Sequence, residues 1–118
     1  MLALRERGLR VARQGAASVL ISQLSQASHA YELDFARFPP GDGTGSATLV
    51  RCLTALSPRR RPYFEAPAEM LGSKGDFLNP VNPDRILSYR CPGVHNPKTF
   101  DLWCEDADGR PDGINNWR

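Results

Sequence analysis

The sequence predicts an α+β fold in which one long N-terminal helix packs on a small antiparallel sheet. Two observations carry this prediction. Apolar residues recur every three or four positions before the proline pair Pro39-Pro40, which is the spacing of one helix face. Two short runs, 86–91 and 100–104, flank a turn-rich segment and have the composition of a β-hairpin. Because a sheet must bury its apolar face, and only the long helix is large enough to cover it, we expect the two to pack together.

Size and composition favour a single folded domain spanning residues 1–118. The chain has 118 residues, with 15 Lys and Arg against 13 Asp and Glu and a net charge of +2. A hydrophobic content of 41% excludes a generally disordered chain. The longest mainly apolar run, 16–21, is far shorter than the roughly 20 residues that span a membrane. The charge is unevenly distributed, because the first residues are basic and the last ones are acidic.

The long helix is predicted over residues 5–36, and it ends before the proline pair. Its buried stripe is expected to consist of Ala16, Leu20, Leu24, Ala27, Tyr31 and Phe35. Such a helix is roughly 45 Å long at 1.5 Å per residue, which is more than a domain of this size needs. Its beginning is therefore expected to project from the body.

The middle of the chain is predicted to hold one short helix and then irregular structure. Ser46 has the position of an N-cap for a helix over 47–56, with Leu49, Leu53 and Leu56 as its buried face. Five prolines interrupt residues 57–85. The run Arg59-Arg60-Arg61 lies there, and it favours an exposed turn, with a phosphate or acidic-lipid site as the alternative.

The predicted second strand, 100–104, places Phe100, Leu102 and Cys104 on one face. After it, residues 105–118 are expected to form an acidic loop. Carboxylates, an amide and two glycines on a turning backbone are typical of Ca²⁺ ligands. The loop is not an EF-hand, because Pro111 stands where that motif needs a glycine. The alternative is an Asp/Gly turn with solvated carboxylates.

Other chemistry has weaker support. Cys91 and His95 have a C-x3-H spacing, but no second pair completes a zinc site. As a nucleophile and base they lack an orienting third group, so we expect no enzyme activity and no small-molecule substrate. His29 is expected to be a surface or half-buried residue of the long helix. The basic start lacks interleaved aromatic residues, so no nucleic-acid partner is expected.

Four landmarks in order resemble those of the pseudopilins of the type II secretion system, and most nearly the major pseudopilin family, general secretion pathway protein G. They are Y-E-L-D-F-A-R-F-P at 31–39, Y-R-C-P-G-V-H at 89–95, F-D-L-W at 100–103, and A-D-G at 107–109 followed by I-N-N-W at 114–117. The resemblance covers most of residues 31–117. It implies a pilin-like fold with a C-terminal acidic loop.

The resemblance also implies a function. Members carry a cleaved and methylated leader followed by a hydrophobic membrane helix, so this chain is expected to be a periplasm-facing, soluble part of an inner-membrane-anchored protein that lacks its N-terminal hydrophobic segment. Its role would be structural, in a pseudopilus that drives protein export across the outer membrane. Its partners would be other pseudopilin subunits and the inner-membrane secretion machinery, while the isolated domain would be monomeric. The alternatives are a type IV pilin, a minor pseudopilin, or a stand-alone calcium-binding or adhesive module.

The family binds Ca²⁺ in its C-terminal loop. Matched by position, the ligands would be Asp108, Asp112 and the carbonyl groups of Glu105 and Arg110. Gly113 stands where members carry a second acidic residue, so Asn115 or Asp106 would compensate. The chain departs from the family because only Arg110-Pro111 separates Gly109 from Asp112, where members carry a longer insert. In an oxidising periplasm a Cys52–Cys104 disulfide, one involving Cys91, or free thiols would all be compatible with the sequence.

Overall fold

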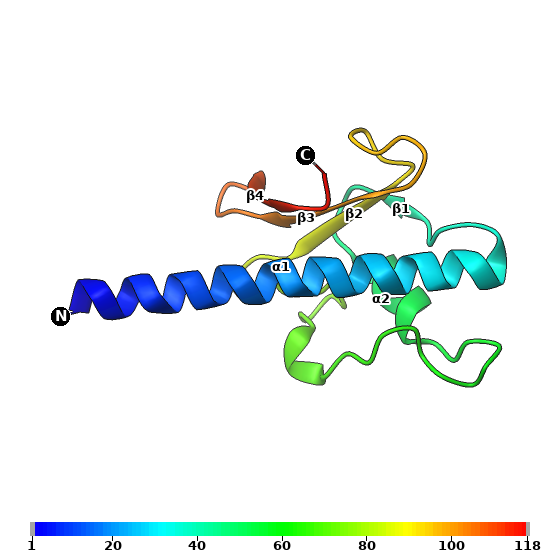
Figure 1. Cartoon of the computed structure of the whole chain (residues 1–118), viewed down its shortest axis with the longest axis horizontal. Helices are drawn as coiled ribbons and strands as arrows, with labels where there is room; N and C mark the ends of the chain where they lie inside the picture. Colours follow the sequence, from blue (N-terminus) through cyan, green and yellow to red (C-terminus); the bar gives the residue numbers. More distant parts are fainter. Residues whose placement is uncertain (1, 118) are drawn as a thin grey trace.

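The structure is a computed structural model, and it describes residues 2–117; the two ends of the predicted domain, Met1 and Arg118, lie outside the described residues. The predicted α+β fold class is confirmed. The elements in chain order are helix α1 (Leu2–Phe35), strand β1 (Gly41–Asp42), helix α2 (Ala47–Thr54), the 3-10 turn η1 (Ala68–Met70), and strands β2 (Leu87–Cys91), β3 (Asp101–Glu105) and β4 (Pro111–Asn115). In Figure 1 the sheet lies along one side of α1, and α2 lies on the other side with the irregular segment that follows it.

Helix α1 begins at Leu2, earlier than the predicted residue 5, and ends at Phe35, one residue before the predicted end. Its end is fixed by Ala36, which has a left-handed φ of 59° and donates its N–H to the Glu32 carbonyl oxygen at 2.7 Å. Residues 8–16 are exposed, and in Figure 1 the N-terminal turns of the helix extend beyond the sheet and α2. The predicted projection of the helix start is therefore confirmed.

The buried face of α1 is broader than the predicted stripe. Leu20, Leu24, Ala27 and Tyr31 are buried as expected, together with Ala17, Ile21 and Ser28. Ala16 and Phe35 were wrong predictions, because both are exposed. The reason is that α1 is covered from two sides, by the sheet and by α2, so the buried surface is wider than a single i, i+3, i+4 row.

The four strands form one antiparallel sheet in the order β1-β2-β3-β4. The predicted hairpin is confirmed as β2 and β3, with Leu87 opposite Cys104. The prediction that 105–118 is a loop was wrong for Pro111–Asn115, which pairs with β3 as β4. This edge strand starts with a proline, contains Gly113 at a φ of 97°, and has a register irregularity opposite β3. Its sequence therefore carries no alternating pattern.

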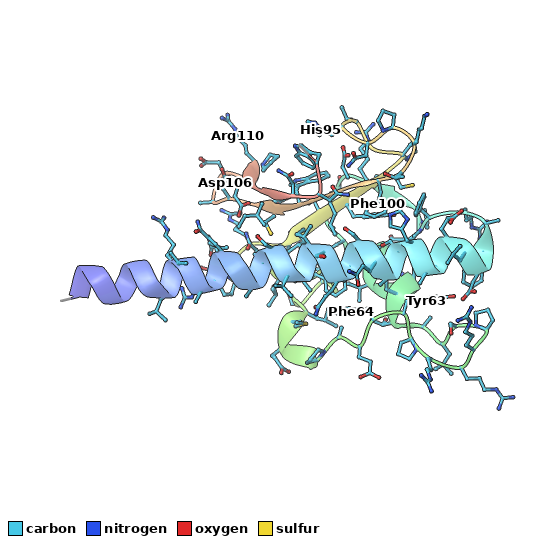
Figure 2. The ribbon with its side chains drawn as sticks, viewed as in Figure 1. Tyr63, Phe64, His95, Phe100, Asp106 and Arg110 are labelled. Atoms are coloured by element: carbon cyan, nitrogen blue, oxygen red, sulfur yellow. The ribbon has the colours of Figure 1, made fainter. Side chains whose placement is uncertain are left out.

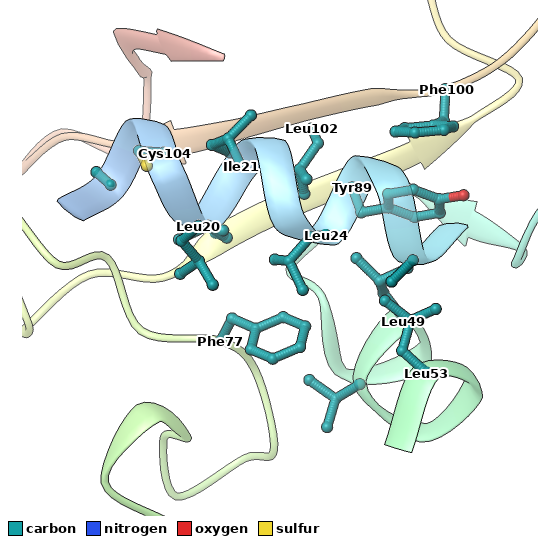
Figure 3. Packing of buried hydrophobic residues seen from close by; sticks show 14 of the residues in the cluster. Leu20, Ile21, Leu24, Leu49, Leu53, Phe77, Tyr89, Phe100, Leu102 and Cys104 are labelled. Atoms are coloured by element: carbon teal, nitrogen blue, oxygen red, sulfur yellow. The ribbon is translucent and has the colours of Figure 1, made fainter. Parts of the chain in front are cut away.

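The core lies between α1, the sheet and α2 (Figure 3). Phe100, Leu102 and Cys104 are all buried, as their shared strand face predicted. From α2 the buried residues are Leu49, Val50 and Leu53. Leu56 was a wrong prediction: the helix ends at Thr54, because Ala55 is already extended, and the Leu56 side chain is 75% exposed.

The start of α2 is capped from a distance. Ser46 precedes the helix as predicted, but its hydroxyl makes no capping bond and instead accepts the Phe77 N–H at 3.0 Å. Oδ1 of Asp76 accepts the N–H groups of Ser46 and Ala47 at 2.7 and 2.9 Å. The Asp76 carboxylate, 30 residues away in the sequence, therefore caps the helix in place of the hydroxyl of Ser46, which the sequence predicted as the N-cap.

No helix among residues 2–117 combines the length and the apolar character needed to cross a membrane. Within the same residues all three cysteines, Cys52, Cys91 and Cys104, are free thiols.

Candidate functional site: the acidic hairpin

The acidic segment is the turn between β3 and β4, and Asp106 organises it. Oδ1 of Asp106 accepts the N–H groups of Asp108 and Arg110 at 2.8 and 3.0 Å. The backbone N–H of Asp106 donates to the Arg110 carbonyl oxygen at 2.7 Å. Gly109 takes a φ of 77°, which an L side chain would strain. These hydrogen bonds hold the pKa of the Asp106 carboxyl below its usual value, with the Arg110 N–H as the largest cause. Figure 2 labels Asp106 and Arg110 at this turn.

The base of the hairpin is held by Asn79, a buried residue that sequence reasoning missed. Its Nδ2 donates to the Glu105 carbonyl oxygen at 2.9 Å and to Oδ2 of Asp112 at 3.2 Å. Its Oδ1 accepts the Val81 N–H at 2.9 Å. Asn79 is 1% exposed, so these partners replace the water that its amide would otherwise require. Nothing in the local sequence distinguishes Asn79 from the other polar residues of the irregular segment.

An open cleft of about 520 Å³ lies between this hairpin and the projecting part of α1. Its carboxylates are Glu105, Asp106 and Asp112, and its cations are Arg10 and Arg13 of α1. Opposite charges therefore face each other across the cleft. The two arginines were noted only as part of a basic start, because the sequence does not reveal that the helix passes the hairpin.

The structure brings together only part of the predicted ligand set. Glu105 and Asp112 reach the cleft, and a side-chain oxygen of each is already used, one by the Ser88 hydroxyl and one by the Ile114 N–H. Asp108 and Arg110 are exposed at the hairpin turn. Asn115 lies at the far end of β4, where its Oδ1 accepts the Trp117 N–H at 2.9 Å.

The fit to Ca²⁺ is thus incomplete in this conformation. Among the described residues, no group of three or more His, Cys, Asp or Glu side chains is placed to hold a metal ion. The two carbonyl groups predicted as ligands, those of Glu105 and Arg110, already accept hydrogen bonds from Asn79 and from the Asp106 N–H. A bound ion would have to share these oxygens or replace their present donors.

At the other end of β3, Asp101 forms a different kind of carboxylate site. Its Oδ2 accepts the N–H groups of Val94 and His95 at 2.7 and 2.9 Å, and its Oδ1 accepts that of Asn96 at 2.9 Å. Asp101 is 2% exposed. A side chain at Gly93 would collide with this carboxylate, so the close approach needs glycine. The landmark P-G-x-H turn is therefore built around one buried carboxylate.

The Cys91 and His95 pair is used structurally. The His95 ring stacks on Trp117 with centroids 4.0 Å apart and planes 7° apart. The Cys91 thiol donates to the Thr99 carbonyl oxygen at 3.4 Å, and burial raises its pKa. A raised thiol pKa disfavours the nucleophilic thiolate. His29, exposed on α1, contacts the edge of Phe38 at 5.1 Å between ring centroids.

Comparison with known proteins adds no relative: no model of a protein family matches the chain, and no curated protein matches it.

Proposed function

We propose that the chain is the globular part of a pilin-like fibre subunit, namely a structural subunit of a type II secretion pseudopilus. One observation carries this proposal: helix α1 is longer than its own domain can cover. The helix continues through residues 8–16 although they are exposed, and it leaves Leu9 and Val11 52% and 62% exposed. Most of the stability of a protein helix comes from packing, so an uncovered stretch of this kind suits contact with helices of other subunits.

The landmark residues support the same proposal, because each ties distant parts of the chain together. The Tyr89 hydroxyl donates to the Pro39 carbonyl oxygen at 2.8 Å and so joins β2 to the end of the first landmark. Tyr31 is buried against Phe35 and Tyr63. Oδ1 of Asn116 accepts the Leu102 N–H at 2.8 Å, which joins the last landmark to the third.

Under this proposal the chain works by assembly rather than catalysis. Its partners are other pseudopilin subunits and the secretion machinery of the inner membrane, with neither a small-molecule substrate nor a nucleic acid. The domain faces the periplasm, and the family's hydrophobic segment, ahead of α1, would supply the anchor. Under this proposal, an isolated domain of residues 1–118 is expected to be monomeric or weakly associated.

Calcium remains part of the proposal. Asp108 and Asp112 would hold the ion together with the carbonyl groups of Glu105 and Arg110, and Asn115 or Asp106 would complete the shell. Support comes from the concentration of carboxylates on a tight turn, where Ca²⁺ would relieve their mutual repulsion. The ion would fix the hairpin relative to the body and would supply no chemistry.

Fibre assembly in the cells that encode the chain tests the proposal. Cells overproducing the full-length protein should yield sheared fibres that an antibody against this chain labels. Leu9→Asp with Val11→Asp should abolish the fibres and protein export while the domain keeps its melting temperature. Val94→Asp is the matched control, because it places a charge at a 66% exposed position on a loop.

Two results would refute the fibre role. In the first, fibres form without the chain. In the second, the helix variant assembles and exports like the wild type. A chain recovered only as a free monomer, with a calcium-dependent melting temperature, would instead favour the stand-alone calcium-binding module.

A further inference from the structure

The run of three arginines forms an ordered turn over residues 57–61. Ser57 closes it: its N–H donates to the Arg61 carbonyl oxygen at 2.9 Å, and its own carbonyl oxygen accepts the Arg60 N–H at 2.8 Å. The Ser57 hydroxyl oxygen accepts the N–H groups of Arg59 and Arg61 at 3.2 and 3.4 Å. Arg60 is held at a φ of 62°, a conformation that non-glycine residues seldom adopt. Three exposed guanidinium groups are therefore presented from a fixed backbone.

Two leucines flank these arginines. Leu33 of α1 is 80% exposed and Leu56 is 75% exposed, the highest values among the large apolar side chains that the structure describes. Leu33 lines an open cleft of about 510 Å³ together with Arg59 and Arg61. Leu56 directly precedes the turn and pairs with Pro62 across it. Residues 57–61 with Leu33 and Leu56 are called the arginine turn below.

The acidic groups nearby do not neutralise the arginine turn. Asp34 lines the same cleft, but its Oδ2 accepts the Tyr63 hydroxyl at 2.6 Å. This hydrogen bond and burial raise the pKa of Tyr63 to about 12, with burial the larger cause, so the tyrosine keeps its proton and the pair persists at neutral pH. Three guanidinium groups thus stand against the one acidic residue that lines this cleft, so the net charge of the surface is positive.

We propose that the arginine turn docks on anionic phospholipid membranes. Guanidinium groups bind phosphate through paired hydrogen bonds, and a planar sheet of phosphates needs no further shape complementarity. The two leucines can enter the boundary between head groups and acyl chains beside the arginines. An acidic protein segment is a poorer match, because Leu33 and Leu56 are both at least three-quarters exposed and only Leu33 lines the open cleft.

The arginine turn lies beside the C-terminal half of α1, at the opposite end of the molecule from the N-terminus (Figures 1 and 2). This inference does not depend on the proposed function, and it concerns a surface that fibre contacts through Leu9 and Val11 leave free.

Vesicle flotation with the 118-residue chain tests the inference. Vesicles of phosphatidylcholine containing about one third phosphatidylglycerol should bind the chain, and vesicles of phosphatidylcholine alone should not. Replacing Arg59, Arg60 and Arg61 by Ser should weaken binding on the order of a hundredfold, at roughly fivefold per arginine. The matched control replaces the exposed residues Lys74, Arg90 and Lys98 by Ser, which removes the same net charge elsewhere and should cost much less.

The leucines are tested separately. Leu33→Ser with Leu56→Ser should weaken binding while leaving its salt dependence unchanged, whereas the arginine variant should lose most of that dependence. Circular dichroism melts of all variants should match the wild type. Three results would overturn the proposal: no flotation with the anionic vesicles, equal losses in the arginine variant and its control, or tighter binding to poly-L-glutamate than to the vesicles. The last result would assign the surface to an acidic protein.

Discussion

The two ends of strand β3 both depend on carboxylates, and they use them differently. At its start, Asp101 is buried and accepts three backbone N–H groups, so one side chain fixes the whole turn after Gly93. At its end, the hairpin contains four carboxylates, but Asp108 is exposed and Asp106 bonds only to its own turn. The number of acidic residues in a segment therefore says little about how much they stabilise the fold. The contribution of a carboxylate depends on its burial and on the number of donors that it accepts from.

The largest expected effect is at Asp101. Asp101→Ala leaves the N–H groups of Val94, His95 and Asn96 without their acceptor, so we expect a loss of about 4 kcal/mol in the free energy of unfolding. Chemical denaturation measures it. Asp108→Ala is the matched control and should change stability by less than about 0.5 kcal/mol in calcium-free buffer. Equal losses in the free energy of unfolding of the two variants would mean that the carboxylates at the two ends of β3 stabilise the fold equally.

Bound Ca²⁺ would make the carboxylates at the hairpin end of β3 stabilise their turn, as Asp101 does at the start of the strand. A ligand at a hundredfold excess over its Kd stabilises the fold by about 2.7 kcal/mol, which raises Tm on the order of 10 °C here. Thermal melts in millimolar Ca²⁺ should show this rise, EGTA should cancel it, and Asp108→Ala should abolish it. Mg²⁺ should substitute poorly, because it demands stricter octahedral geometry. Melts that coincide in calcium and EGTA would identify the segment as a plain Asp/Gly turn.

Asp76 provides an intermediate case. Asp76→Ala removes the acceptor for the first two N–H groups around the start of α2, and we expect a loss of about 1–2 kcal/mol. Ser46→Ala should also destabilise, but through the Phe77 N–H that its hydroxyl accepts, so the two losses should not be additive. A double-mutant cycle by urea denaturation measures this coupling. Additive losses would mean that the two residues act independently.

The smallest effect concerns a thiol next to the hairpin. Burial raises the pKa of Cys104 to about 12, and the Asp112 carboxylate adds to the rise. As pH increases above about 9, the unfolded thiol ionises first, so this contribution to stability is present below that pH and is lost toward pH 12. In the folded protein at about pH 8, Cys104 should resist thiol reagents while partly exposed Cys52 reacts first. Asp112→Asn should lower the Cys104 pKa only slightly.

The sequence predicted those elements whose signal is local. The long helix, the short helix and the β2–β3 hairpin follow from periodicity and turn residues over a few positions. Strand β4 did not, because an edge strand that starts with Pro111 and contains Gly113 has no alternation to detect. The cap of α2 and the support of the hairpin were also missed. Asp76 and Asn79 act across 30 and 26 residues, and no spacing rule encodes such distances.

The predicted calcium ligands show the same limit. Residue type identified the acidic segment, and the resemblance gave five positions within it. Whether five positions converge depends on how the hairpin twists and where α1 passes, which are properties of the folded chain. Asn115 illustrates this, because it is three residues from Asp112 but lies at the other end of a strand that rises roughly 3.3 Å per residue.

Helix α1 packs against α2, β3 and β4, so the first element of the chain is covered in part by the last. A ribosome releases the helix long before it releases β4. Until then the apolar face around Leu20, Ile21 and Leu24 has no sheet to pack against. It therefore stays exposed, and chaperones or the same face of other nascent chains can bind it. The β2–β3 hairpin, whose turn is closed by contacts only a few residues apart, can form as soon as it emerges. The order of synthesis therefore delays the complete burial of the longest helix until the last strand has been made.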